Sequence, residues 1–274
     1  HAVLDTVQWL EKHEGATVVW LPVDHEGVVS EEAIRAELAA HADSTALLTV
    51  MWANNEVGTV QDIPAITALA HEYGVPVHTD AVQAFGSLPV NFRAAGVDTM
   101  AISGHKIGGP VGVGALVVGR AVKLTPVMHG GGQERDIRSG TLDTPGIAAF
   151  AAAAREATEN LPAESARLRQ LRDTLIAGVE REIPDAVLRG AREEQSGDTD
   201  RQGMPRRLPG NAHFTFPGCE GDSLLFLLDL AGVESSTGSA CTAGVPRPSH
   251  VLLAMGLSET EARGAQRFSL GHTT

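Results

Sequence analysis

The chain has 274 residues, of which 43% are hydrophobic, and it carries a formal net charge of -13 at pH 7. This size and composition are enough for a substantial core, in one large domain or two smaller ones. The acidic balance argues against nucleic acid or an anionic membrane as a partner, because both require clustered Lys and Arg. A small-molecule site is therefore favoured.

The sequence carries no signal for a membrane or for secretion. No apolar run approaches the roughly 20 residues that span a bilayer, and no basic and then apolar segment opens the chain. We therefore expect a cytoplasmic protein. Cys219 and Cys241 are expected to be thiols, because a lone disulfide is uncommon in such a chain. Since the chain begins at His1 rather than at Met, we also expect a fragment of a longer protein.

Helical and strand patterns alternate along the first 118 residues. The expected helices are residues 1–15, 31–40 and 65–74. The expected strands are residues 17–21, 45–51, 75–79, 98–103 and 111–118. Ser30 and Asp62 are expected N-caps, and Gly15 an expected helix stop. The near-continuous apolar run 45–51 suits a strand buried on both faces. This alternation predicts an α/β fold, with a mostly parallel sheet covered on both sides.

The pattern changes from about Gly146. Long helical periodicity is followed by a polar stretch that predicts a surface loop, and then by mixed elements. The expected elements are helices 146–160 and 166–183, a loop over 190–207, a strand 211–216, a helix 222–232 and a strand 265–270. We therefore expect a large domain over residues 1–160 and a smaller α+β domain over residues 161–274.

Polar side chains follow three of the expected strands. In open parallel sheets, ligands bind beyond the carboxyl ends of the strands, so these residues are the first candidates for a site. They are Asn54, Asn55 and Glu56 after one strand, Asp80 and Gln83 after the next, and Ser103, His105 and Lys106 after a third.

Each of these residues also has an ordinary structural explanation. Asp80 could cap a helix, His105 could be a structural hydrogen-bonder, and Lys106 could be an exposed loop charge. Together, however, they fit pyridoxal phosphate. That cofactor needs a lysine amine that can lose its proton, a carboxylate at the ring nitrogen and donors for a phosphate.

Six motifs, in one order along nearly the whole chain, resemble those of the NifS/IscS-type cysteine desulfurases. This is a group of pyridoxal-phosphate enzymes of fold type I within the class V aminotransferases. The motifs are "NNEVGTVQDI", "HTDAVQAFGSLPVNF", "SGHKIGGPVGVGA", "HGGGQERDIRSGTLDT", "SSTGSACTAG" with "PSHVLLAMG", and "RFSLG".

The resemblance implies a role for each residue at the strand ends. Lys106 matches the lysine that holds pyridoxal 5'-phosphate covalently and moves the substrate α-proton. Asp80 matches the carboxylate at the pyridine nitrogen, Gln83 the amide at the phenolic oxygen, and Asn55 the asparagine near that oxygen and the substrate carboxylate. Ser103 and His105 match phosphate ligands.

Two further matches imply a substrate contact and a second subunit. Arg267, in "RFSLG", matches the arginine that holds the substrate carboxylate by a bidentate pair. Thr141 matches a threonine that reaches the phosphate of the partner subunit, so the resemblance implies a homodimer.

Cys241 is the residue that points to the desulfurase reaction. A lone cysteine is ordinarily a buried structural thiol, but its neighbours are small or polar, and "GSAC" matches the persulfide-bearing loop of the family. The implied reaction converts L-cysteine to L-alanine and leaves a persulfide on Cys241, whose sulfur then passes to an iron–sulfur scaffold or a tRNA-thiolation enzyme. Cys219 matches no functional position and is expected to be structural.

Other functions stay open or are disfavoured. A selenocysteine lyase or a plain class V aminotransferase would use the same Lys106 and Asp80, and an inactive truncated scaffold protein would use neither. No G-x-S-x-G supports a serine hydrolase, no G-x-x-x-x-G-K-[ST] a nucleotide loop, and no tight Cys/His spacing a metal site.

The resemblance also implies that family elements are missing from this sequence. The Gly/Thr-rich loop that binds the cofactor phosphate lies upstream of the position of His1 in the family, as does the ring-stacking histidine. Relatives also continue beyond "RFSLG" with further helical structure. We therefore expect an N-terminally incomplete cofactor domain, and a 274-residue chain that by itself binds pyridoxal phosphate weakly or not at all.

Overall fold

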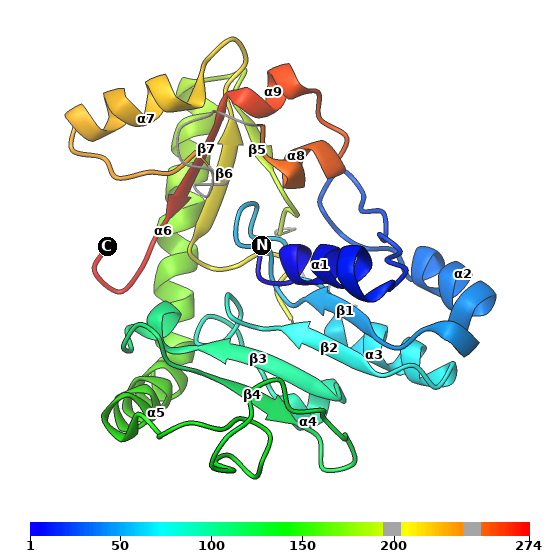
Figure 1. The fold of residues 1–274 in the computed structure, drawn as a ribbon. Helices are drawn as coiled ribbons and strands as arrows, with labels where there is room; N and C mark the ends of the chain where they lie inside the picture. Colours follow the sequence, from blue (N-terminus) through cyan, green and yellow to red (C-terminus); the bar gives the residue numbers. More distant parts are fainter. Residues whose placement is uncertain (194–203, 238–247) are drawn as a thin grey trace.

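The computed structural model describes residues 1–193, 204–237 and 248–274 (Figure 1). The helices are α1 Leu4–Glu14, α2 Glu31–His41, α3 Ile63–Glu72, α4 Phe92–Ala95, α5 Thr144–Glu159, α6 Leu161–Glu182, α7 Gly221–Leu230, α8 His250–Ala254 and α9 Glu259–Arg263, with short 3₁₀ segments η1 Ala42–Ser44 and η2 Gly104–Ile107. The strands are β1 Leu48–Met51, β2 Val77–Asp80, β3 Thr99–Ser103, β4 Gly114–Val118, β5 Val187–Arg189, β6 Asn211–Thr215 and β7 Ala265–Ser269.

The strands form two separate sheets. The first has the order β1-β2-β3-β4, with β1, β2 and β3 parallel and β4 antiparallel to β3. The second is antiparallel, with the order β5-β6-β7, and the long helix α6 runs alongside it (Figure 1). The predicted α/β class and mostly parallel sheet are confirmed. The division at residue 160 stays a prediction. Within the described ranges, no helix has the length and hydropathy to cross a membrane.

The local helix signals act as the sequence predicts. The Ser30 hydroxyl accepts from Ala33 N at the start of α2, and the Asp62 carboxylate accepts from Ala65 N at the start of α3. Both satisfy a backbone N–H that has no partner within the helix. Gly15 ends α1 with φ 70, a left-handed conformation that glycine adopts without steric cost.

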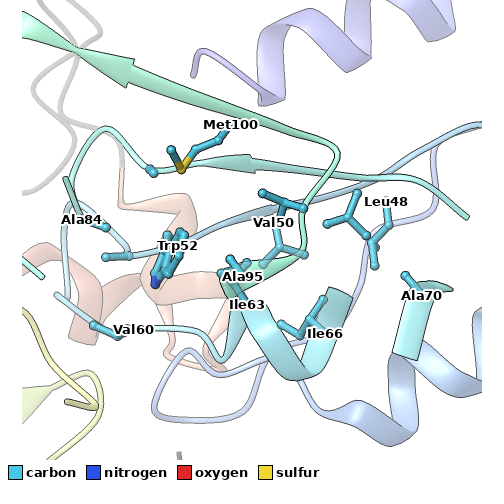
Figure 2. Close-up of a cluster of buried hydrophobic side chains, with 14 of the residues drawn as sticks. Leu48, Val50, Trp52, Val60, Ile63, Ile66, Ala70, Ala84, Ala95 and Met100 are labelled. Atoms are coloured by element: carbon cyan, nitrogen blue, oxygen red, sulfur yellow. The ribbon is translucent and has the colours of Figure 1, made fainter. Parts of the chain in front are cut away.

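The main hydrophobic core lies on one face of the first sheet. Alternate residues of β1 point into it, where they meet side chains of α2 and α3. Figure 2 shows Leu48, Val50, Trp52, Val60, Ile63, Ile66, Ala70, Ala84, Ala95 and Met100 in this core. On the opposite face Thr49, Met51, His78 and Asp80 are only half-buried. The prediction that 45–51 is buried on both faces is therefore met only in part: one face is buried, the other is half-buried, and Leu47 is exposed. The prediction that the sheet is covered on both sides is met in part for the same reason.

Three other expectations differ from the structure. Residues 17–21 form no strand, because the apolar run "TVVWL" pairs with no other described segment; Val19 and Trp20 are exposed. Strand β5 was not expected, since its three residues are too short for a visible pattern. The expected surface loop 190–207 is buried at both described ends, at Ala191 and Arg207, and its residues 194–203 lie outside the description.

Gly58, in the turn after β1, is expected to tolerate no side chain. Its φ is +77, and an added Cβ would lie 2.6 Å from Oδ1 of Asn211. The substitution Gly58→Ala should therefore lower the free energy of unfolding by about 2–3 kcal/mol, measured by urea denaturation. Gly74→Ala is the matched control: its φ is +71, but nothing lies within 4 Å of the added Cβ, so only about 1 kcal/mol of backbone strain is expected. Equal losses in the two variants would contradict the proposed clash.

Candidate active site

The register of the first sheet brings three strand ends to one level. Met51 of β1 lies opposite Asp80 of β2, and Asp80 lies opposite Ala101 of β3. Because the three strands are parallel, the segments that follow them leave the sheet at the same edge. The expected gathering of polar groups at this edge therefore follows from the observed register.

Asp80 provides the carboxylate of this edge. Its Oδ1 accepts a hydrogen bond from Val82 N at 2.9 Å, and no described residue hydrogen-bonds to its other oxygen. His78 lies two residues earlier on the same face, with its Nδ1 2.8 Å from Thr99 Oγ1. Burial lowers the pKa of His78, and the Asp80 carboxylate partly offsets this. A neutral imidazole thus lies beside Asp80, and the carboxylate keeps one oxygen for another partner. Gln83, in the turn that follows, is half-buried.

The residues after β3 form a second polar group at the same edge. The Ser103 hydroxyl lies 2.6 Å from Nδ1 of His105, within hydrogen-bond distance. Lys106 follows in η2. The side chain of Lys106 is exposed and makes no hydrogen bond or ion pair to a described residue. Its amine is therefore available to a ligand.

Arg267, on β7 of the second sheet, reaches the loop that follows β1. Its Nη1 donates to the carbonyl oxygen of Asn55 at 2.9 Å. Burial lowers the pKa of Arg267, and the nearby carboxylate of Glu56 partly offsets this. Its Nε is buried without a hydrogen-bond partner in the described chain. The structure thus places next to Asn55 a guanidinium with a donor that no described residue uses.

Glu56 received no role from the sequence, although it stands in the motif "NNEVG". Its side chain is almost fully buried, and its carboxylate accepts a hydrogen bond from the hydroxyl of Ser249. Asn54 Oδ1 accepts from the backbone N of Glu56 at 2.8 Å and of Val57 at 3.1 Å. These bonds hold the loop in one conformation and fix the position of the Asn55 carbonyl.

Thr141 and Cys241 are not brought to this edge by any observed contact. Thr141 is exposed in the segment between β4 and α5. Cys241 lies outside the described residues. A described residue on each side of the segment that contains it does lie by the site: Ser236 pairs with Arg267 through both backbone hydrogen bonds, and Ser249 contacts Glu56.

Two buried residues next to the site were also missed. Arg207 donates to backbone carbonyls around the β1 loop, and His213 lies between Arg189 and Arg267 in the second sheet. The histidine within the expected strand "NAHFTF" is the signal that points to His213. For Arg207 the sequence offers only a pair of adjacent arginines at the end of a polar stretch, which does not distinguish a buried side chain from an exposed one.

The whole chain, residues 1–274, matches the family model described as aminotransferase class-V. It is 56% identical over all its residues to an IscS-like cysteine desulfurase of Mycobacterium tuberculosis, and covers 67% of that protein. It is 45% identical to a cysteine desulfurase IscS of Clostridium botulinum, over 99% of the chain and 65% of the relative. Among solved structures, a NifS-like protein from Rickettsia africae matches with TM-score 0.80 and 33% identity, over 93% of this chain and 64% of that one. The chain thus spans about two thirds of the length of these relatives.

Proposed function

The chain belongs to the aminotransferase class-V family, and on that premise we propose that it forms part of a pyridoxal-phosphate-dependent cysteine desulfurase. The observation that carries this proposal is the strand register, which aligns the ends of β1, β2 and β3 and so gathers Asn55, Asp80 and Lys106 at one edge. The contact of Arg267 with Asn55 adds a carboxylate-binding group to that edge.

The side chains at this edge fit pyridoxal 5'-phosphate. Asp80 has a carboxylate oxygen that no described residue binds, available to a protonated ring nitrogen, and the Lys106 amine, which has no partner among the described residues, is available to the aldehyde. Ser103 and His105 are adjacent polar groups for the phosphate, and Gln83 is an amide for the phenolic oxygen. The bound cofactor would supply an electron sink for carbanion chemistry at the substrate α-carbon. The exposed amine of Lys106 would then be covered by the cofactor itself.

Arg267 and Asn55 would orient the substrate. A guanidinium with free donors binds the α-carboxylate of L-cysteine in a bidentate pair. Because Nη1 is already held by the Asn55 carbonyl, the guanidinium has little freedom to turn away from this edge. Lys106 would take the α-proton of the oriented substrate and return it later in the reaction.

Cys241 would carry the sulfur. In the net reaction the C–S bond of L-cysteine breaks and an S–S bond forms on Cys241. The β-carbon keeps the electron pair of the broken bond and gains the proton that the Cys241 thiol gives up. It is thereby reduced to the methyl group of L-alanine, while the transferred sulfur is oxidised to the sulfane level. Only the thiolate is the competent nucleophile. No outside oxidant or reductant is needed.

The partners follow from the same proposal. A homodimer would bring Thr141 to the cofactor phosphate of the second subunit. The persulfide sulfur would pass to an acceptor protein, either an iron–sulfur scaffold or a tRNA-thiolation enzyme. The cytoplasm stays our prediction for its location.

The test of this function compares Cys241→Ser with the wild type in the full-length holoenzyme. With L-cysteine and dithiothreitol, the wild type should release sulfide and L-alanine in equal amounts. In Cys241→Ser, sulfide release should fall at least about 100-fold, because serine cannot hold a persulfide. The change in visible absorbance on adding L-cysteine should remain, since substrate binding does not require the thiol.

Cys219→Ser is the matched control, because Cys219 is a free, half-buried thiol in the turn between β6 and α7 and has no role in the proposed reaction. It should release sulfide at the wild-type rate. Activity that survives Cys241→Ser would instead indicate a selenocysteine lyase or a plain aminotransferase. A cofactor-loaded wild type that releases no sulfide would indicate an inactive scaffold.

A further inference from the structure

Buried polar atoms without hydrogen-bond partners gather at one place in the second sheet. In the described chain, both ring nitrogens of His213 and the Nε of Arg267 are such atoms. The others lie on residues that are not neighbours of this pair in the sheet: Thr49, Trp52, Thr67 and Glu193. Buried polar groups are nearly always hydrogen-bonded, so a cluster of three on two residues calls for an explanation.

His213 and Arg267 are direct neighbours across two strands. His213 of β6 lies opposite Arg267 of β7 in the antiparallel register, so their side chains project to the same face. The adjacent residues Ala212 and Phe214 point to the other face, into a hydrophobic cluster beside α6. The face that carries His213 is the one from which Arg267 reaches Asn55 and from which Asn211 reaches the Glu56 carbonyl.

The other cations around His213 already have partners. Arg207 donates from Nε and both Nη groups to backbone carbonyls, and Arg189 donates from Nε to the Thr215 hydroxyl. Arg267 is the neighbour whose Nε–H is still unpaired. The Nε–H of Arg267 is thus a donor on the residue that lies opposite His213. His213 can supply the acceptor, because a neutral imidazole carries one ring nitrogen with a free lone pair.

Burial keeps the ring in this neutral form. His213 is 0% exposed, and burial, reinforced by Arg207, Arg267 and Arg189, lowers its pKa to about 3. An imidazolium would repel Arg267, and a carboxylate at this position would pair with it and compete with a bound anion. A neutral acceptor is the kind of residue that can hold the guanidinium without neutralising it.

We propose that His213 is a positioning residue for Arg267: the two side chains make no hydrogen bond in this structure, but a rotation of the His213 ring or of the Arg267 side chain lets a ring nitrogen of His213 accept the Nε–H of Arg267, which aims the two Nη groups at the α-carboxylate of the substrate. The proposal rests on the proposed function, in which Arg267 binds that carboxylate. With Nε held by His213 and Nη1 by the Asn55 carbonyl, the guanidinium has one orientation, with its outer edge open for a bidentate pair.

The kinetic test compares three variants in the full-length holoenzyme. His213→Phe keeps a ring but has no acceptor, and should raise both KM for L-cysteine and the dissociation constant of L-alanine about tenfold, with kcat changed less than about twofold. His213→Gln restores a neutral acceptor and should stay within about threefold of the wild type. Thr215→Val, two residues along the same face of β6, removes an acceptor from Arg189 instead and should leave both constants unchanged. Circular dichroism checks that each variant is folded.

A second measurement needs neither cofactor nor activity. In the cofactor-free 274-residue chain labelled with ¹⁵N-arginine, the Nε–H of Arg267, assigned by its loss in Arg267→Lys, should exchange slowly with water. It should exchange fast in His213→Phe and slowly in His213→Gln. A fast-exchanging Nε–H in the wild type, or wild-type carboxylate affinity in a folded His213→Phe, would overturn the proposal. If the slow Nε–H is present but the wild-type holoenzyme releases no sulfide, the proposed function fails and the His213–Arg267 bond stands.

Discussion

Replacement of Lys106 by alanine is expected to reduce sulfide release from L-cysteine at least about 10³-fold. The variant loses the amine proposed to hold the cofactor and, with it, the base proposed to move the substrate α-proton. Lys106 is exposed in η2 and has no partner among the described residues, so little else in the described fold depends on it. The thermal midpoint of the cofactor-free chain should therefore stay within about 2 °C of the wild type, so that a loss of activity reports on chemistry.

The sequence allows a direct check of this assignment. It contains only three lysines, Lys12, Lys106 and Lys123. Borohydride reduction of the full-length holoenzyme, followed by peptide mapping, should fix the cofactor on Lys106 among these three. Lys123→Ala is the matched control, because Lys123 is also exposed and also follows a strand of the first sheet, and its activity should be unchanged. A label on Lys12 or Lys123, or wild-type activity in Lys106→Ala, would refute the proposed role.

Replacement of Arg207 by methionine is expected to lower the free energy of unfolding by about 3–5 kcal/mol, with no direct effect on the chemistry. Arg207 is 1% exposed, and its guanidinium donates to the carbonyls of Ala191 (2.8 Å), Val57 (3.0 Å), Asn211 (3.3 Å) and Arg189. Methionine fills the space of the stem but supplies no donor. Several buried carbonyls would then lack a partner, at about 1–3 kcal/mol each. Part of this loss is offset because a buried charge is removed.

Arg207 joins the two sheets, which is why the effect should be large. Val57 belongs to the loop after β1, whereas Arg189 and Asn211 belong to β5 and β6. Burial lowers the pKa of Arg207 to about 10, so the guanidinium stays protonated at neutral pH and keeps all its donors. Urea denaturation of the 274-residue chain measures the loss.

Arg206→Met is the matched control for this prediction. Arg206 precedes Arg207 in the chain, but its guanidinium pairs with Glu26 at 2.6 Å in a partly exposed ion pair. Such pairs contribute about 0–1 kcal/mol. Similar losses in Arg206→Met and Arg207→Met would show that the carbonyl contacts of Arg207 carry no special stability.

Local elements were predictable because their signals lie within a few residues of one another. Ser30 and Asp62 cap helices through contacts three residues away, and apolar periodicity identified β1, β2, β3 and the long helices. The error at residues 17–21 has the same origin. An apolar run shows that a segment can pair, but a strand also needs a neighbouring segment, and for "TVVWL" none is present among the described residues.

The exposure of Lys106 shows a limit of a different kind. The sequence places Lys106 among glycines after a strand, and the covalent chemistry implied by the resemblance favours a buried amine. Whether a side chain is buried depends on what packs over it, and no described segment covers Lys106. The order of the motifs assigned Lys106 to the site, but it could not predict whether the Lys106 side chain is buried or exposed.

The amino-acid sequence by itself determined the α/β class, the alternation of helices and strands, the family resemblance and the chemical groups at the ends of three strands. All of these depend on neighbours close in sequence or on the rule that parallel strands end at one edge. Only the tertiary structure revealed that Arg267 contacts Asn55 across 212 positions, that Ser249 binds Glu56 across 193, and that Arg207 joins both sheets. The reason is physical: the register of strands and the packing of one sheet against a distant loop depend on the whole set of buried contacts, which no short stretch of sequence contains.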